Sequence, residues 1–155
     1  MKKRILIGLA VTMLVLLMVW LLRPRSFANV SQTPGTVRIE LVENNLQHYP
    51  HTIWNLETDD PTYLQLTGIL EQYSYHASLR TIKGDSYMQG NDARYWLFLD
   101  FYSVQGEYTH GITMGGTGEV LIDGRIWNVS YFSNRKQLEM MDAIRNLLVE
   151  VTPDE

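Results

Sequence analysis

The longest apolar run of the chain lies close to its start. Lys2, Lys3 and Arg4 are followed by residues 5–22, which carry no charge and of which twelve are Leu, Ile or Val. A helix of this length spans roughly 27 Å, close to the thickness of the hydrocarbon core of a bilayer. The pattern therefore predicts a transmembrane anchor over residues 5–22.

The charges on either side of this run predict its orientation. Three basic residues precede it, and Arg23 and Arg25 follow it. This bias favours an N-terminus in the cytoplasm and a domain outside it, in a single-pass protein of the cell membrane. A cleaved signal peptide is the alternative, because "SFA" at 26–28 resembles a cleavage site. The run is longer than the roughly 7–15 apolar residues of such a peptide, so we expect a retained signal-anchor.

Residues 23–35 are rich in Pro, Ser, Asn and Gln without an apolar period, which is typical of a juxtamembrane linker. The soluble domain is expected over 36–155. Its first element, 36–43, alternates apolar and polar residues as a half-buried strand does. A short extended piece around 52–56 is possible.

Residues 59–73 are predicted to form a helix. Asp60 is a suitable N-cap and Pro61 a suitable first helical residue. Its apolar stripe comprises Leu66, Ile69, Leu70 and Tyr73. A short strand and a loop are expected after it.

A four-stranded antiparallel meander is predicted over 94–132. In 94–103, Leu97, Leu99 and Phe101 share one face, and Trp96, Phe98, Asp100 and Tyr102 share the other. A strand that is apolar on both faces is usually central or covered on both sides. The connections fall at "QGE", "GGTG" and "DG", and the last is a favoured hairpin pair.

A second helix is predicted over 133–151, capped by Ser133 or Asn134. Its apolar stripe comprises Leu138, Met141, Ile144, Leu148 and Val151. Helices separated in sequence from an antiparallel meander indicate a two-layer α+β domain. The place of the first strand beside the meander is not given by its pattern.

Charge and composition exclude several functions. All 17 acidic residues lie from Glu40 onward against eight basic ones, which gives this part a net charge of −9. Such a surface repels nucleic acid and anionic lipid, so no nucleic-acid partner is expected. The chain has no cysteine, which excludes disulfides and thiolate metal sites.

The "GGTG" at 115–118 does not fit a phosphate-binding loop. A P-loop places a lysine and then Ser or Thr after its last glycine and opens a helix. Here Glu119 follows Gly118, and a predicted strand follows that. We expect a turn, and no cofactor is predicted.

Few residues suggest catalysis or metal binding. His48 and His51 form an H-x-x-H pair, but a zinc site needs three or four ligands. Asp100 lies among aromatic residues, where burial without a partner raises a carboxyl pKa. No nucleophile motif is present, so no catalytic residue is assigned.

The aromatic residues of the meander are the remaining functional signal. Tyr and Trp combine an apolar body with a polar tip, which suits recognition surfaces. If one sheet face is uncovered, a binding patch is expected at Trp96, Phe98, Asp100 and Tyr102, and Trp127 could join it. The sequence thus favours a non-catalytic, membrane-tethered domain that binds a protein partner of unknown identity.

Two alternatives remain open. The first is an envelope hydrolase in which Asp100 acts with one of the histidines His48, His51, His76 or His110. The second is a structural or assembly part that pairs through a sheet edge, with 36–43 as its candidate edge strand. Charged Arg38 and Glu40 argue mildly against such pairing.

Overall fold

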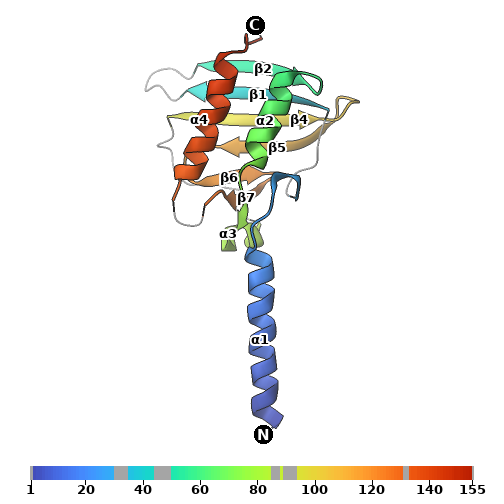
Figure 1. The fold of residues 1–155 in the computed structure, drawn as a ribbon, viewed down its shortest axis with the longest axis vertical. Helices are drawn as coiled ribbons and strands as arrows, with labels where there is room; N and C mark the ends of the chain where they lie inside the picture. Colours follow the sequence, from blue (N-terminus) through green and yellow to red (C-terminus); the bar gives the residue numbers. More distant parts are fainter. Residues whose placement is uncertain are drawn as a thin grey trace.

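The chain folds into a two-layer α+β domain with one long helix extending from it (Figure 1). The computed structural model describes residues 2–29, 35–43, 50–84, 88, 94–130 and 133–154. Its helices are α1 (Lys2–Leu22), the 3-10 turn η1 (Phe27–Asn29), α2 (Pro61–Glu71), α3 (Leu79–Lys83) and α4 (Arg135–Val149). Its strands are β1 (Thr36–Glu43), β2 (His51–Glu57), β3 (His76–Ala77), β4 (Tyr95–Tyr102), β5 (Tyr108–Met114), β6 (Glu119–Ile122) and β7 (Arg125–Asn128).

The strands form one antiparallel sheet in the order β2-β1-β4-β5-β6-β7-β3. Helices α2 and α4 lie side by side across one face of it (Figure 1). The predicted α+β class and the meander from β4 to β7 are confirmed. Three more strands extend the sheet beyond the meander. Strand β1 pairs with β4 and β2 pairs with β1 on one side, and β3 pairs with β7 on the other.

Helix α1 projects from the end of the domain where β7 and β3 lie (Figure 1). Its large apolar side chains are exposed, from Ile5 at 58% to Trp20 at 53%. In the part of the chain that the structure describes, no helix combines the length and the hydropathy needed to cross a membrane.

Strand β1 is not an edge strand. It pairs with β4 along its whole length and with β2 on its other side. The prediction that 36–43 could offer an open edge is therefore wrong. Its alternation correctly gave a strand with one buried face, but alternation does not say which strands lie beside it.

The outer edge of β2 is covered by the C-terminal tail. The backbone N–H of Asp154 donates to the Ile53 carbonyl at 2.9 Å. Its carboxylate accepts from the backbone N–H of Asn55 at 2.7 Å and from the Asn55 side chain at 3.0 Å. These bonds occupy backbone groups that an open edge would offer to another chain.

Part of the segment predicted as a linker packs into the domain. Arg25 and Tyr75 exchange two backbone hydrogen bonds, of 2.9 and 2.8 Å. Phe27 is only 4% exposed, and its ring lies 6.2 Å from the rings of Tyr75 and Phe101. One buried phenylalanine has no periodicity, so the composition of 23–35 did not indicate this contact. Residues 30–34 of the expected linker lie outside the described part.

Helix α2 begins as predicted. The Asp60 side chain accepts a hydrogen bond from the Thr62 backbone at 2.7 Å, and Pro61 is the first helical residue. Leu66 and Leu70 are fully buried, and Tyr63 joins them in the core.

The buried stripe of α4 differs from the predicted one. Gln137, Met140, Met141, Ile144 and Leu148 face the sheet, whereas Leu138 is 39% exposed. The first position of the buried stripe is occupied by a polar residue, Gln137. A search for apolar residues therefore selected its apolar neighbour, Leu138, in its place. Asn134 is the N-cap residue, but its side chain donates to the Gly116 carbonyl at 3.0 Å and does not cap the helix.

Helix α3 was not predicted, since the expectation after β3 was a loop. Its signals are local and short. Ser78 and Thr81 form a capping box, and Gly84 ends the helix in the left-handed conformation at φ 70°. Five residues are too few for an apolar period to show.

The glycines between β5 and β6 connect two strands, as expected. Gly116 and Gly118 have φ of 75° and 85°, which glycine adopts without strain. The Gly118 N–H donates to the buried Gln137 side chain at 2.5 Å, and the Gln137 amide donates to the Glu119 carbonyl. One polar side chain of α4 thus holds the loop against the helix layer.

Candidate functional site

The four residues predicted to bind lie together on the sheet face opposite α2 and α4. Along β4, Leu97, Leu99 and Phe101 are buried in the core, while Trp96, Phe98, Asp100 and Tyr102 alternate with them and are half-buried. We call this surface the open face. With neighbouring strands it comprises Arg38, Glu40, Val42, His51, Ile53, Trp96, Phe98, Asp100, Tyr102, Tyr108, Gly111 and Thr113.

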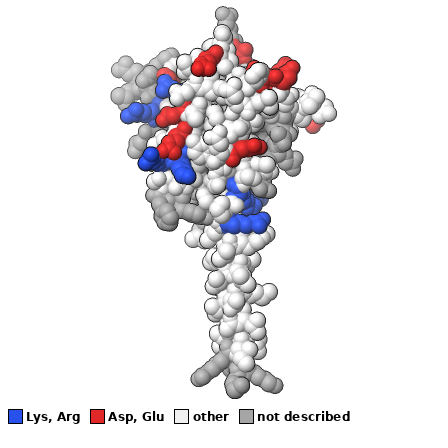
Figure 2. Space-filling model, viewed as in Figure 1, with Lys and Arg blue, Asp and Glu red and all other residues white. Residues whose placement is uncertain are grey.

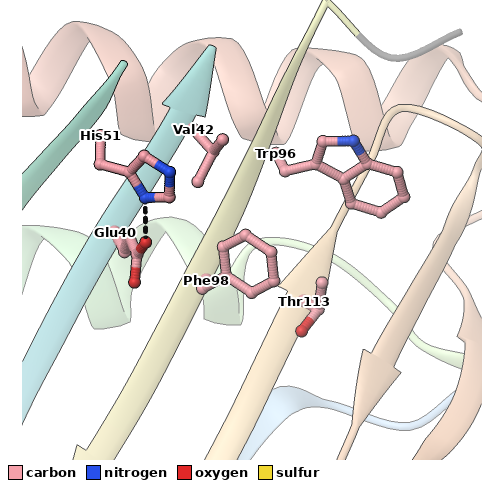
Figure 3. Close-up of a pocket in the computed structure, with 6 residues that line it drawn as sticks. All are labelled: Glu40, Val42, His51, Trp96, Phe98 and Thr113. Atoms are coloured by element: carbon pink, nitrogen blue, oxygen red, sulfur yellow. Dashed lines mark hydrogen bonds and ion pairs between the residues drawn. The ribbon is translucent and has the colours of Figure 1, made fainter. Parts of the chain in front are cut away.

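A hollow of about 560 Å³ lies at one end of the open face (Figure 3). It is lined by Glu40, Val42, His51, Trp96, Phe98 and Thr113. The ring of Phe98 lies between the Glu40–His51 pair on one side and Thr113 on the other (Figure 3). In that pair the His51 Nδ1 and a Glu40 oxygen are 2.5 Å apart. The hollow therefore combines an aromatic floor with a polar pair at its rim.

The indole of Trp96 is supported by Gly115. A Cβ atom at Gly115 would overlap the six-membered ring of Trp96, so only glycine leaves room for it. This is a packing role for the first glycine of "GGTG". It explains how a large side chain on a solvent-facing strand holds one position beside the hollow.

A similar arrangement lies at the other end of the open face. The Tyr108 side chain covers Gly111, where a Cβ atom would overlap its hydroxyl. Its ring also meets Tyr102 edge to face, with centroids 6.0 Å apart. Asp100 lies next to this cluster, since Gly111 is its partner on β5. The open face thus carries a row of aromatic rings along β4 and β5, with Asp100 at this end and Glu40 beside the hollow.

The carboxyl of Asp100 is partly withdrawn from water. Burial raises its pKa, the positive charge of Arg38 across the strand pair opposes this, and Glu40 adds to it. Burial also raises the pKa of Tyr108, and the negative charge of Asp100 contributes to that shift. Arg38 Nε is buried without a hydrogen-bond partner among the described residues. Asp100 and Arg38 are thus oppositely charged neighbours across two strands, and the Arg38 Nε has no partner within the described part of the domain.

Replacing Asp100 with asparagine is expected to stabilise the domain at pH 7. A folded-state pKa above the unfolded value means that the folded state holds the proton more tightly. The ionised carboxylate therefore opposes folding at neutral pH, and this cost disappears as pH falls through the raised pKa. Thermal unfolding of D100N and the parent chain should show a higher Tm for D100N at pH 7, with the difference shrinking toward pH 4. A lower Tm for D100N at pH 7 would contradict this assignment.

The histidines lie apart from Asp100 in the described structure. His51 is bound to Glu40, and His110 Nδ1 lies 2.9 Å from an Asp123 oxygen. Burial lowers the pKa of His76, and Lys136 adds to this. No hydrogen bond or ion pair among the described residues joins a histidine to Asp100. His48 lies outside the described part.

No group of three or more His, Asp or Glu side chains placed to hold a metal ion occurs among the described residues. Of the H-x-x-H pair only His51 is described, and it bonds to Glu40. Asp59 and Asp60 could have added carboxylate ligands to this pair, but the side chain of Asp60 instead caps α2.

Sequence reasoning missed part of the site and misplaced one residue. Trp127 is 7% exposed and lies in the core, so it is not part of the patch. Val42 and Glu40 line the hollow because β1 pairs with β4, and His51 because β2 pairs with β1. The alternation of 36–43 already placed Glu40 and Val42 on one side. It could not tell that this side continues the face of Trp96.

Comparisons of the chain with protein-family models, with curated proteins and with solved structures gave no match.

Proposed function

We propose that this chain is a membrane-anchored protein whose exported domain binds a protein partner through the open face and catalyses no reaction. The observation that carries the proposal is the placement of Trp96, Phe98, Asp100 and Tyr102. All four lie on a partly exposed sheet face, Trp96 and Phe98 line a hollow in it, and the helices cover the other face.

The chemistry of the open face supports binding of a protein. Trp and Tyr bury much surface at a low entropic cost and are frequent energetic anchors of interfaces. Here Trp96 and Tyr108 are held in place over glycines, which lowers the cost of ordering them on binding. The pairs Glu40–His51 and Arg38–Asp100 supply polar groups around them.

The membrane anchor is supported by the sequence and by the exposure of α1. Residues 5–22 carry no charge. The large apolar side chains of α1 from Ile5 to Trp20 are 46–76% exposed, and the helix projects away from the domain (Figure 1). A helix apolar on all sides is stable in a bilayer, where lipid covers each side.

Trp96→Ala and Tyr102→Ala are each expected to weaken partner capture while the domain remains folded. Truncation of an anchor residue at a binding surface costs about 2 kcal/mol or more, which is about thirtyfold or more in affinity. Both side chains are half-buried, so the loss of stability should be modest. The measurement is crosslinking and pull-down of the full-length protein from cells, with the Tm of each variant as a check on folding.

Leu138→Ala is the matched control, because Leu138 is an exposed apolar residue of α4 in the helix layer. It should capture the partner as the parent does. Equal capture by all three variants would contradict a binding role for the open face. Unfolding of the Trp96 and Tyr102 variants would show that these residues serve stability instead.

A further inference from the structure

Helix α3 exposes an apolar side. Leu79 and Ile82 are 66% and 49% exposed. They lie three positions apart and so share one side of the helix, and exposed Lys83 follows them. On the other side, Thr81 is buried and its hydroxyl donates to the Ile126 carbonyl in β7. The helix is thus fixed to the sheet with two large apolar residues turned outward.

Helix α3 lies where α1 leaves the domain (Figure 1). Strand β3, directly before α3, contacts α1. The backbone pairing of Arg25 with Tyr75 ties the end of α1 to the same segment. Only Arg23 and Pro24 separate α1 from this pairing. If α1 spans a bilayer, α3 lies at the level of its surface.

Basic side chains gather at the same place. Arg23 lies over the ring of Trp20 at 5.7 Å, and Arg25 lies over the ring of Trp127 at 5.4 Å. On the side of the molecule drawn in Figure 2, one group of Lys and Arg lies where the domain meets α1, and a second group lies on the domain among Asp and Glu. The Asp and Glu residues lie farther from α1 than the first group does. The junction of the domain with α1 thus carries basic side chains on this side of the molecule, whereas Arg80 on α3 itself is ion-paired with Glu119.

We propose that α3 docks into the headgroup region of the anionic phospholipid bilayer that α1 spans, with Leu79 and Ile82 inserted and Arg23 and Lys83 facing the phosphates. This inference rests on the proposed membrane anchor. Apolar side chains flanked by basic ones favour an anionic membrane surface. Trp20 lies in the last turn of α1, and tryptophan favours the interface between the hydrocarbon core and water. Its position therefore also places the end of α1, and with it α3, at the membrane surface.

Docking would fix how the domain presents the open face. The strands run across the axis of α1, and they stack along it from β3 near α1 to β2 far from it (Figure 1). With α3 held at the membrane, the open face points sideways along the bilayer. A partner in the same membrane would then meet Trp96 and Phe98 directly.

Single-cysteine labelling tests this contact, because the chain has no native cysteine. Ile82→Cys and Val149→Cys in the full chain each receive an environment-sensitive fluorophore. Val149 is 78% exposed and ends α4 at the far end of the domain (Figure 1). In vesicles of phosphatidylcholine and phosphatidylglycerol, iodide should quench the probe at 82 several-fold less than the probe at 149. Spin-labelled lipid should quench only the probe at 82.

A variant pair separates docking from local packing. Leu79→Glu should restore iodide quenching of the probe at 82. Leu64→Glu should leave that quenching unchanged, because Leu64 is a comparably exposed leucine (62%) on α2. Equal iodide quenching at 82 and 149 in the parent would overturn the proposal.

A third probe at Leu14→Cys in α1 distinguishes failure of α3 docking alone from failure of the membrane anchor. Quenching of this probe by spin-labelled lipid, with the probe at 82 fully accessible to iodide, would refute docking of α3 and leave the anchor standing. A probe at 14 that lipid does not quench would refute the anchor and the docking together.

Discussion

Replacing Phe27 with alanine is expected to lower the free energy of unfolding by about 3–5 kcal/mol, as truncation of a fully buried phenylalanine does. Phe27 is 4% exposed and packs against Tyr75 and Phe101, although it lies in a stretch whose composition is that of a linker. The cavity left by the ring would lie between η1 and the sheet. Urea unfolding of the full chain in detergent measures the change.

The neighbouring Ala28→Ser is the control for this prediction. Ala28 is exposed, so its replacement should change the free energy of unfolding by less than about 0.5 kcal/mol. A loss below about 1 kcal/mol for Phe27→Ala would contradict the packing of this segment into the core. It would also remove the short, ordered connection between α1 and the domain on which docking of α3 depends.

Gln137→Leu is expected to cost about 2–5 kcal/mol, although leucine is nearly the same size and more apolar. Gln137 is completely buried, accepts from the Gly118 N–H and donates to the Glu119 carbonyl. Leucine would leave the buried Gly118 N–H and the part-buried Glu119 carbonyl without these partners, and each loss costs about 1–3 kcal/mol. The loop between β5 and β6 would separate from α4, and the free energy of unfolding reports this.

Lys136→Leu controls for the introduction of a leucine in the first turns of α4. Lys136 is exposed, so a change within about 0.5 kcal/mol is expected. If Gln137→Leu were neutral or stabilising, the two hydrogen bonds would contribute no net stability.

The strands could be predicted from sequence because their signals are local. Alternation gave β1 and both faces of β4, and the pair Asp123–Gly124 gave the turn between β6 and β7, with φ of 49° and 72°. The cap at Asp60 gave the start of α2. Each signal lies within a few residues of the element that it specifies.

What could not be predicted depends on contacts between distant residues. Packing between distant parts of the chain determines which strands lie beside β1. Alternation within 36–43 reports only that one face is buried, so it was compatible with an edge position as well as a central one. Gln137 is buried because of a loop nearly twenty residues earlier in the chain. Trp127 has the same amphipathic character as Trp96, yet its place on β7 directs it into the core.

The candidate site also has a part that could be predicted from local sequence and a part that depends on contacts between distant residues. The four residues on β4 could be named because one strand supplies them all. The rim of the hollow comes from β1, β2 and β5, which meet β4 only through pairing. Gly111 and Gly115 appeared in the sequence as turn or strand residues, and their role under Tyr108 and Trp96 is visible only in three dimensions.

Protease accessibility of the domain in intact cells tests most directly that this is an exported domain on a membrane anchor. The account predicts that the full-length protein stays with the membrane fraction. Protease added to intact cells should digest the domain, and protease added to inverted membrane vesicles should not. Protection in intact cells with digestion in inverted vesicles would reverse the topology and direct the open face to a cytoplasmic partner. Recovery of the intact protein in the soluble fraction would contradict the anchor itself.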